Sequence, residues 1–159
     1  MNLTGWFVIM QGNTEITWRI PDMSTPIAVG GHIYIAAKNT GCFPEPDLMI
    51  EGMNFGHGGA FRLTLRDADE RLIEPAGSRH MPPFAGIYDG QVVRSMEKIE
   101  LMFGGRGSES NSWHHYTEAT VDIPNNDRVA ENCRVRTLAS PGRPNSPDYS
   151  GAFSAGSLE

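Results

Sequence analysis

The chain has 159 residues, of which 39% are hydrophobic, and a formal net charge of −6 at pH 7. This length fits one domain with a core of its own, taken here as residues 1–157, because Leu158 and Glu159 are interpreted as a cloning scar. The acidic balance has the wrong sign for a surface that neutralises phosphates, so nucleic acid is not expected as a partner.

The first half of the chain is predicted to form short strands. Its longest apolar run, WFVIM at residues 6–10, reads as a strand and is far shorter than the roughly 20 residues of a membrane-spanning helix, so no membrane insertion is expected. Apolar and polar side chains alternate in TEITWRIP, residues 14–21, and in part of PIAVGGHIYIAAKN, residues 26–39. The stretch AFRLTLRDADERLIEP, residues 60–75, predicts a hairpin with its turn at residues 67–70.

The second half continues this pattern. Good helix formers in VVRSMEKIELMF, residues 92–103, leave a short helix as an alternative, but alternating apolar residues favour a strand. WHHYTEATVDIP, residues 113–124, and ENCRVRTLASP, residues 131–141, also alternate. Seven to nine short strands separated by turns predict an all-β fold, an antiparallel β-sandwich or a barrel-like domain of the jelly-roll or lectin-like kind.

The two cysteines, Cys42 and Cys133, lie 91 positions apart, and neither has the neighbours of a zinc site. The alternatives are one long-range disulfide and two free thiols. In an exported protein, a bridge that closes so long a loop would contribute about 4 kcal/mol. In the cytosol the same residues would be ordinary buried thiols. We predict the Cys42–Cys133 disulfide, and with it an extracellular or cell-surface location as a fragment of a larger exported protein.

The stretch SWHHYTEATVDIP, residues 112–124, raises the question of a metal or ligand site. Successive side chains of a strand point to opposite faces, so His114 and His115 cannot close on one metal. We expect His115, on the face of Trp113, at the margin of the core. His114 and Tyr116 are expected in a polar outer row.

A ligand surface on this strand is the site hypothesis. An aromatic side chain would offer a flat apolar face, and a histidine would offer a polar tip beside the glycine-rich loop. The alternative is that the histidines are merely solvated or locally hydrogen-bonded. The predicted ligand-binding residues are Trp113, His114, Tyr116, Asn111 and Ser112.

The acidic turn at Asp67, Asp69 and Glu70 is a weak candidate for calcium, the one cofactor considered, because carboxylate oxygens lie close together there. The turn lacks the glycine and the distal glutamate of an EF-hand, and aspartates in turns also accept hydrogen bonds from their own backbone. A second acidic cluster comprises Glu45, Asp47 and Glu51.

No catalytic signature is complete. GHGGAF, residues 56–61, has the glycines of an oxyanion loop, but no G-x-S-x-G nucleophile motif accompanies it. Walker loops, dinucleotide fingerprints and H-E-x-x-H motifs are also absent from the sequence. Paired glycosidase carboxylates stay open, because their partners meet only in the fold. We expect a protein that is not an enzyme.

The closing stretch SPDYSGAFSAGS, residues 146–157, resembles the last strands of bacterial β-sandwich lectins and fimbrial subunits. The resemblance covers a dozen residues, implies an extracellular binding module and assigns no site residue. We therefore hypothesise a receptor- or glycan-binding adhesin tip domain of a bacterial pilus or phage tail fibre, with a cell-surface glycan or lipopolysaccharide as partner. The alternatives are a structural subunit that assembles with copies of itself in a pilus, capsid or tail, and a small hydrolase.

Overall fold

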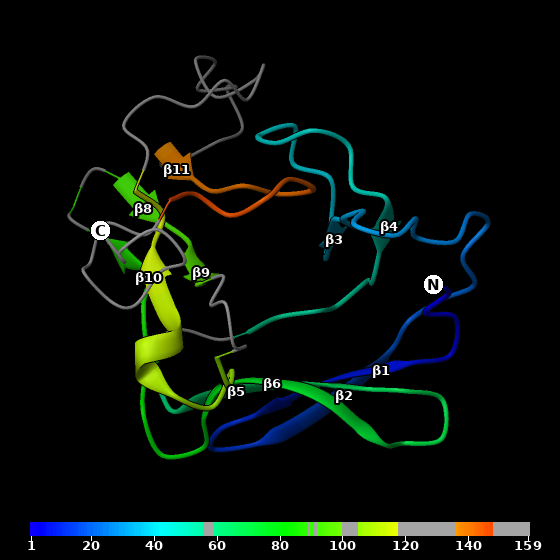
Figure 1. The fold of residues 1–159 in the computed structure, drawn as a ribbon, viewed down its shortest axis with the longest axis horizontal. Helices are drawn as coiled ribbons and strands as arrows, with labels where there is room; N and C mark the ends of the chain where they lie inside the picture. The colour runs from blue at the N-terminus through cyan, green and yellow to red at the C-terminus, as the bar shows by residue number, and fades with distance from the viewer. Residues whose placement is uncertain (56–58, 89, 91, 100–104, 118–135, 148–159) are drawn as a thin grey trace, which may run out of the picture. The chain divides into compact units, whose positions relative to one another are not determined.

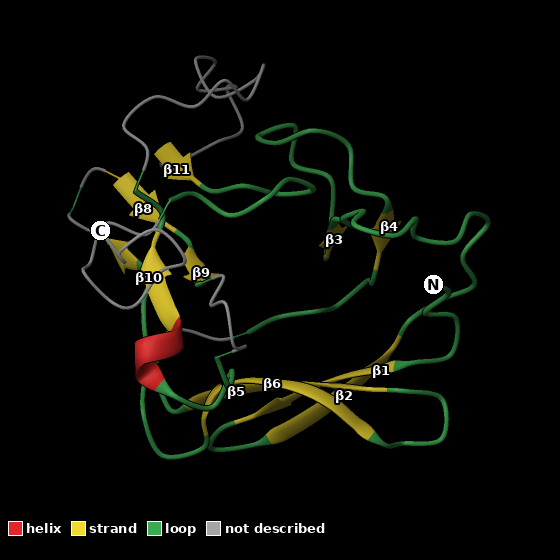
Figure 2. Ribbon diagram, viewed as in Figure 1, coloured by secondary structure: helices red, strands yellow, loops and turns green. Residues whose placement is uncertain are grey.

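The computed structural model describes residues 1–55, 59–88, 90, 92–99, 105–117 and 136–147. The described chain consists of short strands and loops, with a single 3-10 turn at Ser110–Ser112 (Figures 1 and 2). The all-β prediction is confirmed. Every sheet in the described part has two open edges, so the sandwich or barrel stays a prediction.

The strands have two to seven residues each. In chain order they are β1 (Phe7–Gln11), β2 (Glu15–Arg19), β3 (Ile35–Ala36), β4 (Leu48–Met49), β5 (Phe61–Arg66), β6 (Leu72–Ser78), β7 (Ile87–Tyr88), β8 (Val92–Arg94), β9 (Met96–Lys98), β10 (Trp113–His115) and β11 (Arg136–Leu138).

The chain divides into two compact units. Unit 1 comprises Met1–Asn39 and Glu45–Pro83, and unit 2 comprises Thr40–Pro44 and Phe84–Glu159. The chain therefore passes from unit 1 to unit 2, back to unit 1 and again to unit 2. The assignment of residues 1–157 to one domain stays a prediction.

Unit 1 contains a four-stranded antiparallel sheet in the order β2-β1-β5-β6. The strands predicted at residues 6–10 and 14–21 and the hairpin at residues 60–75 are confirmed by β1, β2 and the β5–β6 pair. Of residues 26–39, only β3 is a strand, and it pairs in parallel with β4. Gly30, with φ of +71°, occupies a left-handed turn before it, which interrupts the extended backbone.

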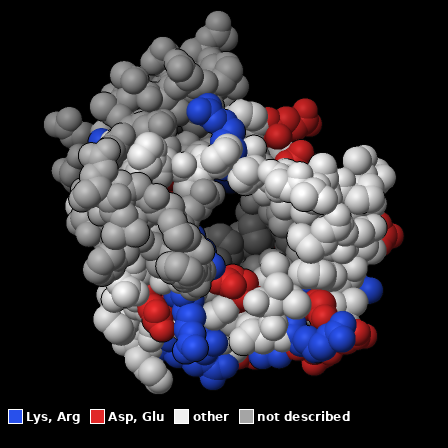
Figure 3. All heavy atoms as spheres, viewed as in Figure 1, with Lys and Arg blue, Asp and Glu red and all other residues white. Residues whose placement is uncertain are grey.

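The apolar core of unit 1 lies between this sheet and the β3–β4 pair. Val8 of β1 stands beside Trp18 of β2 and Leu65 of β5 in the sheet register, so one face is apolar. We call the following cluster the unit 1 core: the buried residues Leu3, Ile20 and Ile50, with Trp6, Val8, Trp18, Met23, Ile27, Ile33, Ile35, Leu48, Met53 and Leu65 packed around them. On the face drawn in Figure 3, Lys, Arg, Asp and Glu gather along the four-stranded sheet, and the region of β3 and β4 is mostly uncharged.

Unit 2 contains a three-stranded sheet, β11-β8-β7, and a two-stranded sheet, β10-β9. The strand prediction for residues 92–103 is confirmed over its described part, but Ser95 divides it into β8 and β9. The Ser95 N–H donates to the Leu138 carbonyl, and the Ser95 carbonyl accepts from the Tyr116 N–H, both at 3.0 Å. This change of partners lets β8 pair with β7 and, in parallel, with β11, while β9 pairs with β10.

Candidate functional site

The β9–β10 pair carries the histidines singled out in the sequence. Its register places Trp113 opposite Lys98, His114 opposite Glu97, and His115 opposite Met96. Residues directly opposite each other in an antiparallel pair share a face of the sheet. The pair therefore has one face with His114 and Glu97, and an outer face with Trp113, His115, Lys98 and Met96.

The His114 face is buried and polar. Glu97 and His114 are 3% and 5% exposed, and His114 Nε2 lies 4.0 Å from Glu97 Oε2. The Glu97 carboxylate accepts hydrogen bonds from the Ser146 N–H at 2.8 Å, from the Ser146 hydroxyl at 2.6 Å and from the Ser140 hydroxyl. We call Glu97, His114, Ser140 and Ser146 the Glu97 network. It gives a buried carboxylate the hydrogen bonds that offset its loss of water.

The Glu97 network has the residue types of a serine hydrolase triad without its connections. In a triad, the serine hydroxyl donates to the histidine and the acid orients the far side of the imidazole. Here both serine hydroxyls donate to the carboxylate instead. His114 Nδ1 is buried without a partner in the described part of the chain, and Ser146 is also buried. This arrangement holds chain segments together, and the hydroxyls of Ser140 and Ser146 are both engaged with the carboxylate rather than with His114.

The alternation predicted for this strand is present, but the buried side is the opposite of the one expected. His114 and Tyr116, predicted in an outer row, are buried, and His115, predicted at the core margin, is exposed. Tyr116 belongs to an apolar cluster with Leu138, against which Phe43 and Val92 pack. The burial is inverted because the buried side of this strand is polar, with Glu97, Ser140 and Ser146 in the same network as His114.

The outer face presents a fixed aromatic ring. Trp113 is partly exposed, and its Nε1–H donates to the Gly107 carbonyl at 2.9 Å, which orients the indole. His115 is exposed, and its Nδ1 accepts from the Gly86 N–H at 2.9 Å. A ring nitrogen that accepts a hydrogen bond carries no proton, so the neutral imidazole keeps its proton on Nε2. Asn111 is exposed on the 3-10 turn immediately before β10.

The structure thus divides the predicted ligand-binding set. Trp113 and Asn111 are accessible, whereas Ser112, His114 and Tyr116 are 1%, 5% and 2% exposed. The prediction did not include His115 in the set. Its i, i+2 spacing from Trp113 was the available signal, since that spacing places two residues on one face of a strand.

The acidic turn between β5 and β6 is held by Arg71. Asp67 accepts from the Arg71 Nε–H at 2.6 Å and from the Arg71 and Asp69 backbone N–H groups, and Asp69 accepts from Arg71 Nη2 at 2.8 Å. Glu70 occupies the left-handed region with φ of 63°. Arg71 therefore takes up carboxylate oxygens that calcium would need. Among the described residues, no group of three His, Cys, Asp or Glu is arranged to hold a metal ion.

These contacts change the acidity of the turn. Burial acts to raise the pKa of Asp67, but hydrogen bonds from the Arg71 amide and guanidinium, the Arg71 charge and the Asp69 amide outweigh it and hold this pKa below its usual value. The same partners, above all the Asp67 hydrogen bond, raise the pKa of Arg71. In the folded chain Asp67 therefore keeps its charge to a lower pH than an ordinary aspartate does.

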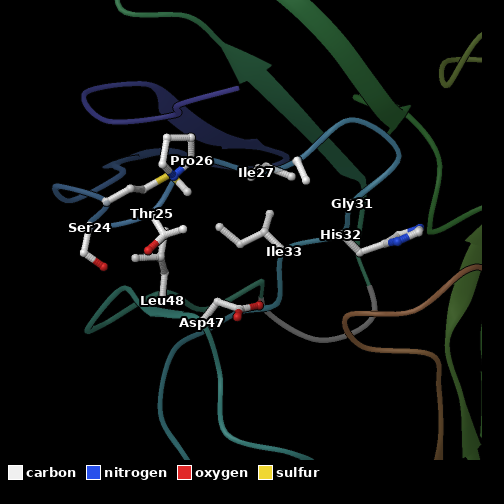
Figure 4. Close-up of a pocket in the computed structure, with 11 residues that line it drawn as sticks. Ser24, Thr25, Pro26, Ile27, Gly31, His32, Ile33, Asp47 and Leu48 are labelled. Atoms are coloured by element: carbon white, nitrogen blue, oxygen red, sulfur yellow. The ribbon is translucent and has the colours of Figure 1, made fainter.

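A second candidate site is a pocket of about 330 Å³ in unit 1. Figure 4 shows Pro26 and Ile27 on one side of it and Asp47 and Leu48 on the other, with Ile33 pointing toward the middle. Its lining residues are Met23, Ser24, Thr25, Pro26, Ile27, Ala28, Gly31, His32, Ile33, Asp47 and Leu48. The sequence placed Asp47 in an acidic cluster but gave no sign of this pocket, because segments that lie apart in the sequence form it.

Two further predictions concern the chain as a whole. Cys42 is partly buried in the segment Thr40–Pro44 of unit 2, and Cys133 lies outside the described residues, so the disulfide stays a prediction. Within the described residues, no helix has the length and hydropathy to cross a membrane.

Comparisons with known proteins identify no relative. No protein-family model, no curated protein and no solved structure matches the chain. The functional proposals below therefore depend on the geometry of the described residues.

Proposed function

We propose that the chain is a non-enzymatic binding module that recognises a cell-surface glycan or lipopolysaccharide through the outer face of β9–β10. The observation that carries the proposal is the partly exposed Trp113 ring, which its hydrogen bond to Gly107 holds in one orientation. Saccharide rings present an apolar face that stacks on such an aromatic platform, and a fixed ring loses little conformational entropy on binding.

The polar groups around the ring fit the hydroxyls of a sugar. His115 would donate from Nε2, since Gly86 fixes Nδ1 as an acceptor, and the exposed Asn111 amide can both donate and accept. An apolar platform with a few placed polar groups is the usual composition of a small-ligand site. His115 thus takes the role that the sequence hypothesis gave to His114.

The extracellular context is part of the same proposal. Phe43, next to Cys42, packs against the cluster of Tyr116 and Leu138, and Leu138 follows Cys133 by five residues. Five residues span at most about 18 Å, so a Cys42–Cys133 bridge is within reach of the chain. We propose this disulfide, a lectin-like β-sandwich built on the observed sheets, and a place as an adhesin tip of a pilus or phage tail fibre.

The test is a glycan and lipopolysaccharide array, run with the native chain and with Trp113→Ala, once with calcium and once with a chelator. We expect selective binding by the native chain and a loss of at least about fivefold in Trp113→Ala, because stacking on an aromatic ring is worth about 1 kcal/mol or more. Tyr88→Ala is the matched control, since Tyr88 is a 61% exposed aromatic residue of the same unit. Undiminished binding by folded Trp113→Ala would refute this site.

A structural assembly subunit is the second candidate, and the free edge of β2 favours it. Among the described strands β2 pairs with β1 alone, and Ile16 on it is 40% exposed. The Ile20 N–H donates to the Trp6 carbonyl, and the Gly12 N–H donates to the Thr14 carbonyl. These two bonds establish which residues of β2 direct their backbone N–H and carbonyl groups toward β1 and which direct them away. Thr17 then stands at a position whose N–H and carbonyl point away from β1, ready for another strand.

Sedimentation across a range of concentrations tests this candidate. If copies pair through β2, the native chain associates, and Thr17→Pro abolishes association because proline removes the outward N–H. Thr14→Pro, outside β2 in the adjoining turn, is the control for a general effect of proline. A chain that stays monomeric at all concentrations excludes assembly through this edge.

A further inference from the structure

The pocket of unit 1 has an apolar floor and a polar rim. Ile27, Ile33 and Leu48 line it and also pack against the unit 1 core, so these side chains are held in place from behind. The rim carries the exposed residues Ser24 and Thr25 and the carboxylate of Asp47. Figure 4 shows His32 pointing away from the pocket, so its imidazole does not contribute to the rim.

The charges of the rim restrict the ligand. Asp47 Oδ2 accepts from the Tyr34 N–H at 2.7 Å, which fixes the carboxylate, and Oδ1 has no partner in the described part of the chain. Among the described residues that line the pocket there is no lysine or arginine, so repulsion from Asp47 disfavours an anion. A neutral ligand that donates a hydrogen bond fits these charges.

We propose that this pocket binds the acetamido group of a neutral N-acetylated amino sugar. The acetyl methyl group would pack on Ile27, Ile33 and Leu48, the amide N–H would donate to Asp47 Oδ1, and the acetyl carbonyl would accept from the Thr25 hydroxyl. Each of the three parts of the group meets a matching part of the pocket. This site lies in unit 1 and does not depend on the Trp113 site of unit 2.

Titration of the full chain with three sugars that differ only at carbon 2 tests the proposal. The readout is the NMR methyl resonances of Ile27, Ile33 and Leu48. We expect N-acetylglucosamine to shift them, and glucose to bind at least about tenfold more weakly, because it lacks both the methyl group and the amide N–H. Glucosamine, a cation without the acetyl group, is expected to be as weak as glucose. Equal shifts with glucose, or tighter binding of glucosamine, would overturn the assignment.

Two variants locate the contacts. Asp47→Asn keeps an oxygen for the Tyr34 N–H but loses the charged acceptor, and Thr25→Val removes an exposed hydroxyl; each is expected to weaken N-acetylglucosamine binding about tenfold. Glu45→Gln removes one nearby charge outside the lining and should leave binding unchanged. If Asp47→Asn does not fold, Thr25→Val decides alone, and unchanged affinity in it contradicts the proposal. Trp113→Ala is expected to keep these shifts, so failure of this site and failure of the proposed function are distinguishable.

Discussion

The contacts inside unit 1 differ in kind from the contacts inside unit 2. The unit 1 core has three buried hydrophobic residues and ten partly buried ones packed around them. In the described part of unit 2, the apolar cluster has two buried and two partly buried members, and three members of the Glu97 network, Glu97, His114 and Ser146, are also buried. Apolar burial has no preferred direction, whereas hydrogen bonds to a buried carboxylate require defined geometry. The described part of unit 2 therefore depends on a few directional contacts, and unit 1 on many interchangeable ones.

The largest effect is expected from Glu97→Ala. This change leaves the Ser146 N–H and both serine hydroxyls without their buried acceptor, and we expect it to destabilise unit 2 by about 4 kcal/mol. Amide hydrogen exchange measures which strands lose protection, and we expect the loss in β9 and β10 rather than in β1. Glu109→Ala, at an exposed glutamate of the same unit, is the control. Equal protection in Glu97→Ala and the native chain would show that the network is dispensable.

Ile20→Ala tests the contribution of the apolar core to the stability of unit 1. Ile20 is 1% exposed in the unit 1 core, and its truncation is expected to cost about 3 kcal/mol from lost transfer energy and the cavity left behind. Urea unfolding measures the change. Ile16→Ala, on the same stretch of chain but 40% exposed, should cost less than about 1 kcal/mol. If the two variants are equally stable, the apolar core does not hold unit 1 as described.

The smallest effect concerns the hairpin turn of unit 1 and depends on pH. Because the folded-state pKa of Asp67 is lowered, its contribution to stability is present above the unfolded pKa of about 3.9 and is lost as the pH falls through the folded value. Urea midpoints of the native chain and Asp67→Asn should therefore differ at pH 7 and converge below about pH 4. Asp22→Asn, at an exposed aspartate of the same unit, should show no such convergence. A constant difference between pH 7 and pH 3 would contradict the role of the Arg71 contacts.

The fold was predictable where apolar residues alternate against charged ones. In β2 and β5 apolar residues alternate with polar ones, and both segments are strands, so pattern and structure agree. The loop before β3 was not predictable, because its path depends on the left-handed turn at Gly30 and on packing against the unit 1 core. The break at Ser95 also escaped prediction, since only the positions of β10 and β11 show that the strand changes partners there.

The candidate site was predictable in part, for a physical reason. Alternation along residues 113–117 correctly separated Trp113 and His115 from His114 and Tyr116. It could not show which side is buried, because both sides carry polar and aromatic residues of similar hydrophobicity. The residue that decides which side is buried is Ser146. It lies 29 residues beyond Thr117, and its hydroxyl also accepts a hydrogen bond from the Thr117 N–H.

The Glu97 network also determines when unit 2 can fold during synthesis of the chain. Ser146 is made 49 residues after Glu97, which corresponds to about 2 to 10 s at ribosomal speed. During that interval the Glu97 carboxylate lacks the hydrogen bonds that make its burial tolerable, so the β9–β10 pair cannot close in its final form. Unit 2 is expected to fold only after residue 146 has left the ribosome, and a transcript cut short before residue 146 would yield a protein with an unfinished second unit.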